Sequence, residues 1–270
     1  GMLFRKDSGV KIFILGTGRM GAWLVEEFCH QHQVAVYDRD LNKLKCFDNV
    51  ERFSDLNEVT SFQPELAINA VSPQNTVSAF EELLPLIPAN CMLSDIASVK
   101  AGVAEFYRKI GRRFVSSHPM FGPTFANIRD LRHENAIIIS ESDPAGKAFF
   151  RHFFENLQLN IFEYTFEEHD QTTAYSLGTP FVSTLTFAAN LKMQKVPGTT
   201  FRKHLEIARG LLSEDDYLLS EVLFNPYTLQ QIELINSRLS FLTHIIRGRD
   251  YEEMKRFLDN LRKNISALKE

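Results

Sequence analysis

Apolar residues follow two different spacings along this chain of 270 residues, and the change lies near residue 166. Before that point, short runs rich in β-branched and aromatic residues are separated by stretches with helical periodicity. These runs are VKIFIL, VAVYD, LAINAV, CMLSDI, RFVSSH, AIIIS and LNIFEY. Strands that alternate with helices predict an α/β fold, in which helices cover a parallel sheet.

Beyond that point, only helical spacing is present. Apolar residues recur every three or four positions in two long sets, and VPGT and NP mark breaks between helices. The sets are Leu229, Ile232, Ile235, Leu239, Leu242 and Ile246, then Tyr251, Met254, Leu258, Leu261, Ile265 and Leu268. The sequence therefore predicts a sheet domain over residues 9–166 and an all-helical domain over residues 167–270. We expect such helices to pack against a second copy of the chain in a homodimer.

Composition and charge argue against several classes of protein. Hydrophobic residues make up 44% of the chain and charged residues 24%, as in ordinary soluble globular proteins. The net charge of −4, with no basic run among aromatic residues, argues against a nucleic-acid partner. No apolar run reaches the roughly 20 residues of a membrane span, and the charged start lacks a signal peptide. Three widely spaced cysteines fit a reducing cytoplasm.

The first predicted strand runs directly into GTGRMG, which has the pattern GxGxxG ahead of a helix. Gly16 would make the tight turn, Gly18 would admit a pyrophosphate against the backbone, and Gly21 would let helix and strand pack closely. The anion would rest on the helix N-terminus, beside Arg19 and Met20. Glycine-rich turns also serve as plain connections, but a strand before and a helix after favour a Rossmann-type dinucleotide site.

Asp38 ends the second predicted strand, about 20 residues beyond the first glycine, where a carboxylate accepts hydrogen bonds from the adenosine ribose. A carboxylate there repels a 2′-phosphate, so NAD is favoured over NADP. Arg39 weakens this preference, because an arginine can pair with the extra phosphate. Val71 and Ser72, in the turn AVSP at the end of the run LAINAV, would lie beside the cofactor, although an ordinary loop explains them equally well.

His118 ends the predicted strand RFVSSH, at the sheet edge where open α/β folds bind ligands. The prolines and glycine that follow would hold its ring at the nicotinamide end of the cleft. An unperturbed pKa of about 6.5 leaves the ring mostly neutral at pH 7, ready to accept a substrate proton as hydride leaves. The alternative is a histidine that only packs in a loop. Ser98 would reach the same cleft, cap a helix that begins near Val99, or do both.

Four segments, GTGRMG, SDIASVK, SSHPMFGPT and EEHD, together resemble the prephenate dehydrogenase family of tyrosine biosynthesis. The resemblance covers nearly the whole chain, and HPMFGP with the upstream SVK is its most specific part. It implies a Rossmann domain, a helical dimerisation domain and oxidative decarboxylation of prephenate to 4-hydroxyphenylpyruvate with NAD. In that scheme His118 accepts the proton of the ring hydroxyl, and Ser98 supports the same hydroxyl and the nicotinamide.

Prephenate carries two carboxylates, so its site requires cations. Arg202 and Arg209 are seven residues apart and hence share one helix face, and the resemblance implies basic substrate-binding residues on the matching helix. Arg202 matches such a position, whereas the match of Arg209 stays open. Glu206 lies between them, so an exposed ladder of charges is the alternative.

Two departures from the family pattern leave the substrate open between prephenate and its amino analogue arogenate. Gly178 and Thr179 stand where some relatives carry a histidine, and Thr124 stands where some carry an acidic residue. His169 and Asp170, in EEHD, are interpreted as helix-start and packing residues rather than catalysts. The remaining histidines show no spacing typical of metal ligands, so we expect no metal.

Two further functions compete with this interpretation. A β-hydroxyacid dehydrogenase shares the N-terminal pattern, but its GxxxKxxxN signature requires a lysine where this chain has Val182. A sensor that binds NAD without turnover stays open, and in it a His118→Ala change would leave function unaltered. No length remains at either end for a regulatory module, so we expect any feedback by tyrosine to act at the active site itself.

Overall fold

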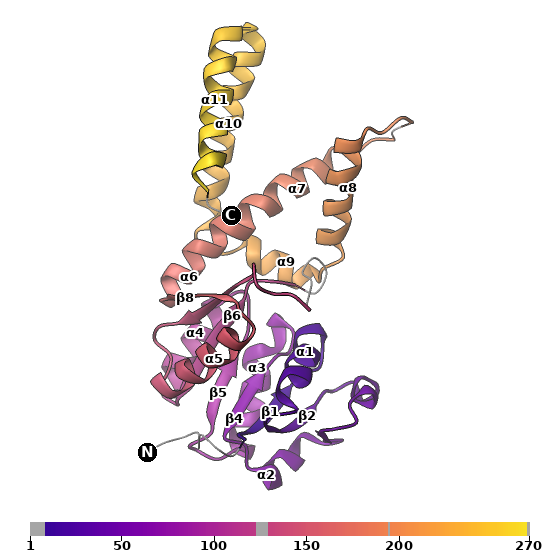
Figure 1. The fold of residues 1–270 in the computed structure, drawn as a ribbon, viewed down its shortest axis with the longest axis vertical. Coiled ribbons are helices and arrows are strands. Elements are labelled where there is room, and N and C mark those ends of the chain that lie inside the picture. The colour runs from indigo at the N-terminus through magenta and orange to yellow at the C-terminus, as the bar shows by residue number, and fades with distance from the viewer. Residues whose placement is uncertain (1–8, 123–128, 194, 269–270) are drawn as a thin grey trace.

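A computed structural model describes residues 9–122, 129–193 and 195–268. A sheet with helices on both faces forms one half of the molecule, and a group of long helices extends away from it (Figure 1). Pro123 and Thr124, considered above, lie outside the described residues.

The sheet has eight strands in the order β3-β2-β1-β4-β5-β6-β7-β8. The strands are β1 (Lys11–Leu15), β2 (Gln33–Tyr37), β3 (Glu51–Arg52), β4 (Leu66–Asn69), β5 (Met92–Asp95), β6 (Phe114–Pro119), β7 (Asn135–Ile139) and β8 (Asn160–Tyr164). Every residue of β4 and β5 is buried, because helices cover both faces. The predicted α/β fold is confirmed, and β3 is the strand that the sequence did not predict.

One strand pair departs from the predicted parallel arrangement. β6 and β7 run antiparallel, with His118 opposite Ile137, whereas all other neighbours are parallel. A parallel connection requires a crossover, usually a helix, and no helix is described between these two strands. An antiparallel pair needs no such crossover.

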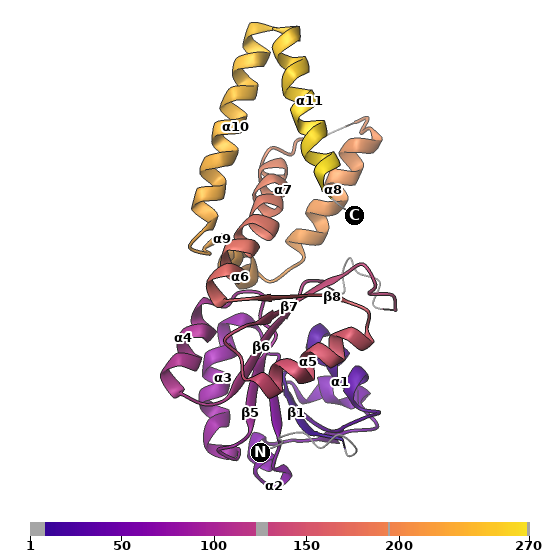
Figure 2. The same cartoon turned by 60° about the vertical axis from the view of Figure 1, so that its left-hand side comes forward.

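Helices cover the two faces of the sheet (Figure 2). Each face has its own apolar core. On one face lie α1 (Arg19–Phe28) and α5 (Pro144–Asn156), through buried residues that include Trp23, Leu24 and Phe150. On the other lie α3 (Thr76–Leu83) and α4 (Ala101–Ile110), through residues that include Phe80 and Tyr107. Shorter turns of helix are α2 (Val59–Phe62) and the 3₁₀ segments Leu41–Cys46, Leu56–Glu58, Pro73–Asn75 and Leu84–Leu86.

Every described element after β8 is helical, as the periodicity predicts. These are α6 (Phe166–Thr173), a π-helical turn (Ala174–Gly178), α7 (Thr179–Ala189), α8 (Thr199–Leu212), α9 (Asp216–Leu223), α10 (Thr228–Gly248) and α11 (Tyr251–Ala267). The breaks at VPGT and NP fall between helices, as predicted. The division into domains at residues 9–166 and 167–270 stays a prediction.

The long helices bury few of their side chains. α7 and α11 have no buried residue, and α10 buries Thr228 and Ile245 alone among its 21 residues. α10 and α11 lie side by side and project away from the sheet (Figures 1 and 2). Their exposed apolar side chains include Leu229, Leu234, Leu239, Phe241, Ile246, Tyr251, Leu258, Leu261 and Ile265. No helix in the described ranges combines the length and apolarity that crossing a bilayer requires.

Candidate active site

The glycine-rich turn has the geometry that the sequence predicts. Gly16 has φ +92°, and a Cβ there would lie 2.8 Å from the backbone nitrogen of Val71. A Cβ on Gly21 would collide with the carbonyl oxygen of Gly16, whereas one on Gly18 would meet open space. Gly18 precedes α1, which begins at Arg19 and Met20 and has neither a side-chain cap nor an acidic residue in its first turn. The turn thus offers an anion a close approach to the positive end of a helix.

Asp38 is tied to this turn. The backbone N–H of Thr17 donates to Asp38 Oδ2 at 2.8 Å, and the Thr17 hydroxyl lies 3.1 Å from the same oxygen. Arg39, the residue expected to weaken the preference for NAD, forms an exposed ion pair of 2.8 Å with Glu82 of α3. An exposed pair of this kind contributes about 0–1 kcal/mol, so it restrains Arg39 only weakly.

The turn after β4 lies against the glycine-rich turn, so closely that a Cβ on Gly16 would collide with the backbone of Ala70 and Val71. Val71 is half-buried there, and its N–H donates to the side-chain oxygen of Asn69 at 3.3 Å. Ser72 is exposed, and its hydroxyl accepts from Asn75 Nδ2 at 3.0 Å. The structure therefore brings Val71 beside the proposed pyrophosphate position, and the cofactor roles of both residues stay predictions.

His118 belongs to β6 and is 5% exposed. Its Nδ1 lies 2.9 Å from Nε2 of His169, and Nδ1 of His169 lies 3.1 Å from Oδ1 of Asp170. Both His169 and Asp170 come from α6, so the helix that follows the sheet contributes directly to the predicted site. This contact was not predicted from the sequence.

The interpretation of His169 and Asp170 as helix-start residues is wrong, whereas the burial of His169 agrees with its interpretation as a packing residue. α6 begins at Phe166, and Thr165 and Glu168 form a capping box that satisfies its first amides. His169 and Asp170 therefore lie beyond the first helical residues, where His169 is fully buried. The signal available in the sequence was a carboxylate directly after a histidine in the EEHD segment.

A fully buried ion pair lies beneath His118. Lys100 Nζ is 2.7 Å from Asp95 Oδ2 and donates to the carbonyl oxygen of Ser117 at 2.6 Å. Tyr107 donates its hydroxyl proton to the other oxygen of Asp95 at 2.8 Å. Lys100 thus fixes the backbone immediately before His118. The sequence analysis quoted SDIASVK but missed Asp95 and Lys100, although charged residues are rarely buried unless they are paired.

Burial sets the protonation of the two histidines. Burial lowers the pKa of His118 well below its ordinary value, and repulsion from the Lys100 ammonium, and from His169 whenever that ring is protonated, lowers it further. Burial also lowers the pKa of His169, although the hydrogen bond to Asp170 acts in the opposite direction. Both rings are therefore neutral at pH 7, which is the state that a proton acceptor requires.

Ser98 lies in the loop between β5 and α4 and is half-buried. α4 begins at Ala101, and no side chain caps its N-terminus. The alternative role of Ser98 as a helix cap, with a helix that begins near Val99, is therefore wrong. Within the described part of the chain its hydroxyl has no hydrogen-bond partner, which leaves it available to a substrate.

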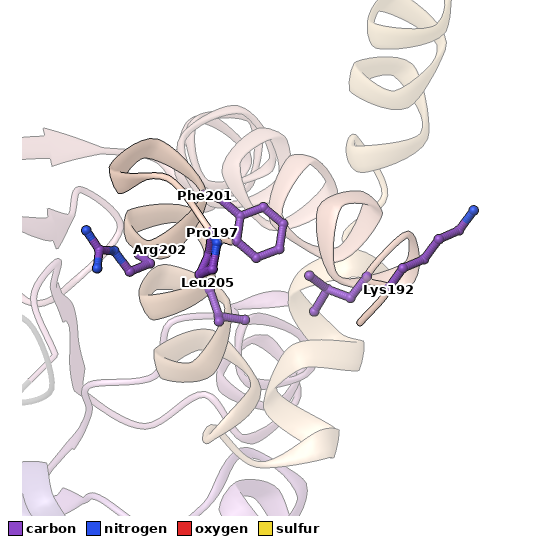
Figure 3. Close-up of a pocket in the computed structure, with 6 residues that line it drawn as sticks. Lys192, Pro197, Phe201, Arg202 and Leu205 are labelled. Carbon is purple, nitrogen blue, oxygen red and sulfur yellow. The ribbon is translucent and has the colours of Figure 1, made fainter. Parts of the chain in front are cut away.

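Arg202 and Arg209 are exposed on α8. Across the described ranges neither pairs with Glu206 or any other carboxylate, so the ladder of charges is absent. No hydrogen bond there joins either arginine to His118. Arg202 borders a surface hollow of about 250 Å³, and its guanidinium points away from the ring of Phe201 (Figure 3). The other residues that line the hollow are Leu191, Lys192, Pro197 and Leu205.

The segment that departs from the family pattern packs against α10. Gly178 is buried, and a Cβ on it would lie 3.4 Å from Oγ1 of the fully buried Thr228. A Cβ at this position would therefore make ordinary van der Waals contact with Thr228. Among the residues that the structure describes, no group of three His, Cys, Asp or Glu side chains is arranged to hold a metal ion.

Residues 25–143 match the family model described as prephenate dehydrogenase, nucleotide-binding domain. The predicted resemblance to the prephenate dehydrogenase family is confirmed. The chain is 23% identical, over 97% of its length, to a probable arogenate/prephenate dehydrogenase of Methanocaldococcus jannaschii, and it spans 62% of that relative. It is 24% identical, over 94% of its length, to arogenate dehydrogenase 2, chloroplastic, of Arabidopsis thaliana, and it spans 74% of that protein.

Among solved structures, prephenate dehydrogenase from A. aeolicus, in complex with hydroxyphenyl propionate and NAD+, superposes with a TM-score of 0.83. It is 17% identical to this chain, and the match covers 97% of this chain and 99% of that one. This likeness establishes a common fold. The relatives are named for both substrates, so the resemblance is to the prephenate and arogenate dehydrogenases together. The expectation of NAD agrees with the nucleotide-binding family and with the NAD+ in that complex.

Proposed function

We propose that the protein is an NAD-dependent dehydrogenase that oxidises and decarboxylates prephenate to 4-hydroxyphenylpyruvate in tyrosine biosynthesis. The observation that carries the proposal is His118, a buried and neutral imidazole at the carboxyl edge of the sheet. One of its ring nitrogens is engaged by His169, so the other is left for a substrate. The family resemblance supplies the substrate class.

The cofactor is NAD, which supplies the hydride acceptor when bound. The open space at Gly18 and the uncapped start of α1 suit its pyrophosphate, and Asp38 is held where the adenosine ribose is expected. The residues that we assign to NAD are Gly16, Gly18, Arg19, Met20, Gly21, Asp38, Val71 and Ser72.

His118 and Ser98 are the proposed catalytic residues. Nε2 of His118 accepts the proton of the ring hydroxyl while the carbon beneath that hydroxyl loses its hydride. The Ser98 hydroxyl, which has no partner in the described part of the chain, donates to the same oxygen and orients it. Loss of carbon dioxide then restores the aromatic ring, which makes the overall step favourable.

Arg202 and Arg209 are the proposed substrate-binding residues, because prephenate presents carboxylates and both guanidinium groups are exposed without a carboxylate partner. We further propose a homodimer formed through α10 and α11, which expose large apolar side chains in one chain. In such a dimer, an arginine can serve its own site or the site of the partner.

The proposal also assigns a role to each half of the chain and a location in the cell. We assign residues 9–166 to cofactor binding and residues 167–270 to substrate binding and assembly. We assign the protein to the cytoplasm, since Cys29, Cys46 and Cys91 are all free thiols. Arogenate dehydrogenase is the second candidate function, favoured by the name of the Arabidopsis thaliana relative.

The test is the appearance of NADH when purified protein and NAD receive prephenate or arogenate in parallel. Turnover of prephenate that is lost in His118→Ala but kept in His152→Ala supports the proposal, because His152 is exposed on α5. Turnover of arogenate alone would make arogenate the substrate of the same oxidative decarboxylation. Tight binding of NAD without turnover of either compound would favour the sensor.

A further inference from the structure

If both imidazole rings are neutral, the hydrogen bonds that link His118, His169 and Asp170 can run in one direction only. The carboxylate of Asp170 can only accept, so the contact of 3.1 Å requires a proton on Nδ1 of His169. A neutral His169 then has an unprotonated Nε2, which accepts. Across the contact of 2.9 Å, Nδ1 of His118 must therefore donate.

The opposite direction would require a charged ring. If Nε2 of His118 carried its proton, Nδ1 would accept, and His169 would have to be protonated on both nitrogens. The charged groups that face the pair are Asp170 of α6, Asp95 of β5 and Lys100 before α4. Burial and the Lys100 ammonium oppose a second cation, and they lower the pKa of both histidines despite Asp170. The neutral arrangement is therefore the stable one.

We propose that His169, oriented by Asp170, is a positioning residue that holds His118 in the tautomer protonated on Nδ1, so that Nε2 is the base. The catalytic part of this inference rests on the proposed function. The proton of the substrate hydroxyl forms a bond to Nε2 of His118, and the electron pair of the broken O–H bond becomes part of the new carbonyl as hydride leaves. His169 donates nothing to the substrate and acts only through His118.

Several contacts fix the position of the His118 ring, so that its tautomer is the main property still left to be set. Its backbone pairs with Ile137 across the antiparallel ladder, and Lys100 holds the carbonyl of Ser117 just before it. The bond to His169 then fixes the plane of the ring. Without this bond both tautomers are open to His118, and a ring protonated on Nε2 presents a donor where the reaction requires an acceptor.

The tautomer can be measured without any substrate. In protein with ¹⁵N-labelled histidine, the nitrogen signals of His118, assigned with a His118→Gln variant, should show a protonated Nδ1 and an unprotonated Nε2 at neutral pH. In His169→Phe the pattern should change to a protonated Nε2 or a mixture. A protonated Nε2 in the wild type, or an unchanged pattern in His169→Phe, would overturn the inference.

Kinetics test the consequence for catalysis. His169→Phe should lower kcat by about 10- to 100-fold and change KM less than about threefold, because a misdirected base affects the chemical step. His169→Gln should retain most of kcat, since its amide oxygen can accept from Nδ1 of His118, and the exposed His152→Gln is the control. Equal losses in the Phe and Gln variants would contradict the inference.

A second variant separates positioning from folding. Asp170→Asn removes the charge that orients His169 and keeps the side-chain shape, so it should lower kcat and raise the fraction of His118 protonated on Nε2. Full activity with an unchanged nitrogen pattern would contradict the role of Asp170. If the wild type oxidises neither prephenate nor arogenate but shows the predicted nitrogen pattern, the proposed function fails and the tautomer assignment stands.

Discussion

At the scale of single residues, charge is concentrated in the buried region below His118. Lys100 and Asp95 have no exposed side-chain surface, and their pair is completed by Tyr107 and the carbonyl of Ser117. Burial lowers the pKa of Lys100, while the neighbouring Asp95 raises it. Such a pair is costly to break on one side, because the remaining charge stays buried without compensation.

We predict that Lys100→Met lowers the free energy of unfolding by about 3–5 kcal/mol. The carboxylate of Asp95 would remain in the interior with only neutral donors, so the double variant Asp95→Asn/Lys100→Met should cost less than the sum of the single changes. Urea unfolding followed by circular dichroism measures both. Lys147→Met is the control, because its pair with Glu163 is partly exposed and should contribute about 1 kcal/mol or less. A Lys100→Met variant as stable as this control would contradict the prediction.

The two histidines also predict how stability depends on pH. Their pKa values are lowered in the folded state, so the unfolded state binds more protons once the pH falls below about 6.5. Stability is then full above that pH and is lost as the pH falls toward the folded pKa values. His118→Gln should reduce the slope of the unfolding free energy against pH by up to about 1.4 kcal/mol per pH unit, because one proton fewer is taken up on unfolding.

Urea unfolding of His118→Gln and wild type between about pH 7 and pH 5 measures this slope. The His152→Gln variant should keep the wild-type slope, since His152 is exposed and its hydrogen bond in the described part of the chain is to the nearby Asn156. His32 also has a pKa lowered by burial, so some slope remains in every variant. Identical slopes for His118→Gln and wild type would refute the prediction.

At the scale of elements, the glycine-rich turn separates the requirements of folding from those of binding. Gly21 lies where helix α1 meets the turn, and any side chain there collides with the carbonyl of Gly16. Gly18, three residues earlier, has an ordinary negative φ and open space around it. The same motif therefore contains one glycine that the chain needs for packing and one that only a bound molecule requires.

We predict that Gly18→Ala leaves the melting temperature nearly unchanged and weakens NAD binding by at least about tenfold, because the new methyl group occupies the space of the pyrophosphate. Gly21→Ala should lower the free energy of unfolding by about 1–3 kcal/mol and weaken NAD binding as well. Differential scanning calorimetry and titration of NAD measure the two effects. Equal NAD affinity in Gly18→Ala and wild type would exclude the proposed pyrophosphate position.

The strands and long helices were predictable because their apolar spacing is local. β3 has two exposed residues and hence no such spacing, so it was missed. The antiparallel pairing of β6 and β7 depends on the path of a connecting loop, which periodicity does not report. His118 and Ser98 were proposed from their place after strands, whereas the contact between His118 and His169 was missed because it joins residues 51 positions apart in sequence.

At the scale of the whole molecule, the helices beyond the sheet leave many apolar side chains exposed in a single chain. α11 has no buried residue, and Ile265 and Leu261 are 71% and 40% exposed. Helices in proteins owe most of their stability to the packing of an apolar face against a neighbour. A second copy of the chain supplies faces of the same composition, which is the reason for the proposed homodimer.

We predict that light scattering gives a mass twice the 31.0 kDa of the chain. Leu239→Glu on α10 or Ile265→Glu on α11 should shift the protein toward the monomer, because each places a charge in the proposed interface. Leu41→Glu, a change at an apolar residue with 47% exposure beside the sheet, should keep the wild-type mass. A wild type that stays monomeric at all concentrations would rule out the homodimer.

The order of the elements along the chain also sets an order of events during synthesis. All eight strands lie between Lys11 and Tyr164, so the whole sheet has been translated before the long helices exist. At about 5–20 residues per second, the ribosome needs roughly 5–20 s more to make the last hundred or so residues. His169 is among the first residues of that interval. A nascent chain that stalls just before it therefore has every strand of its sheet and lacks the ring that directs His118.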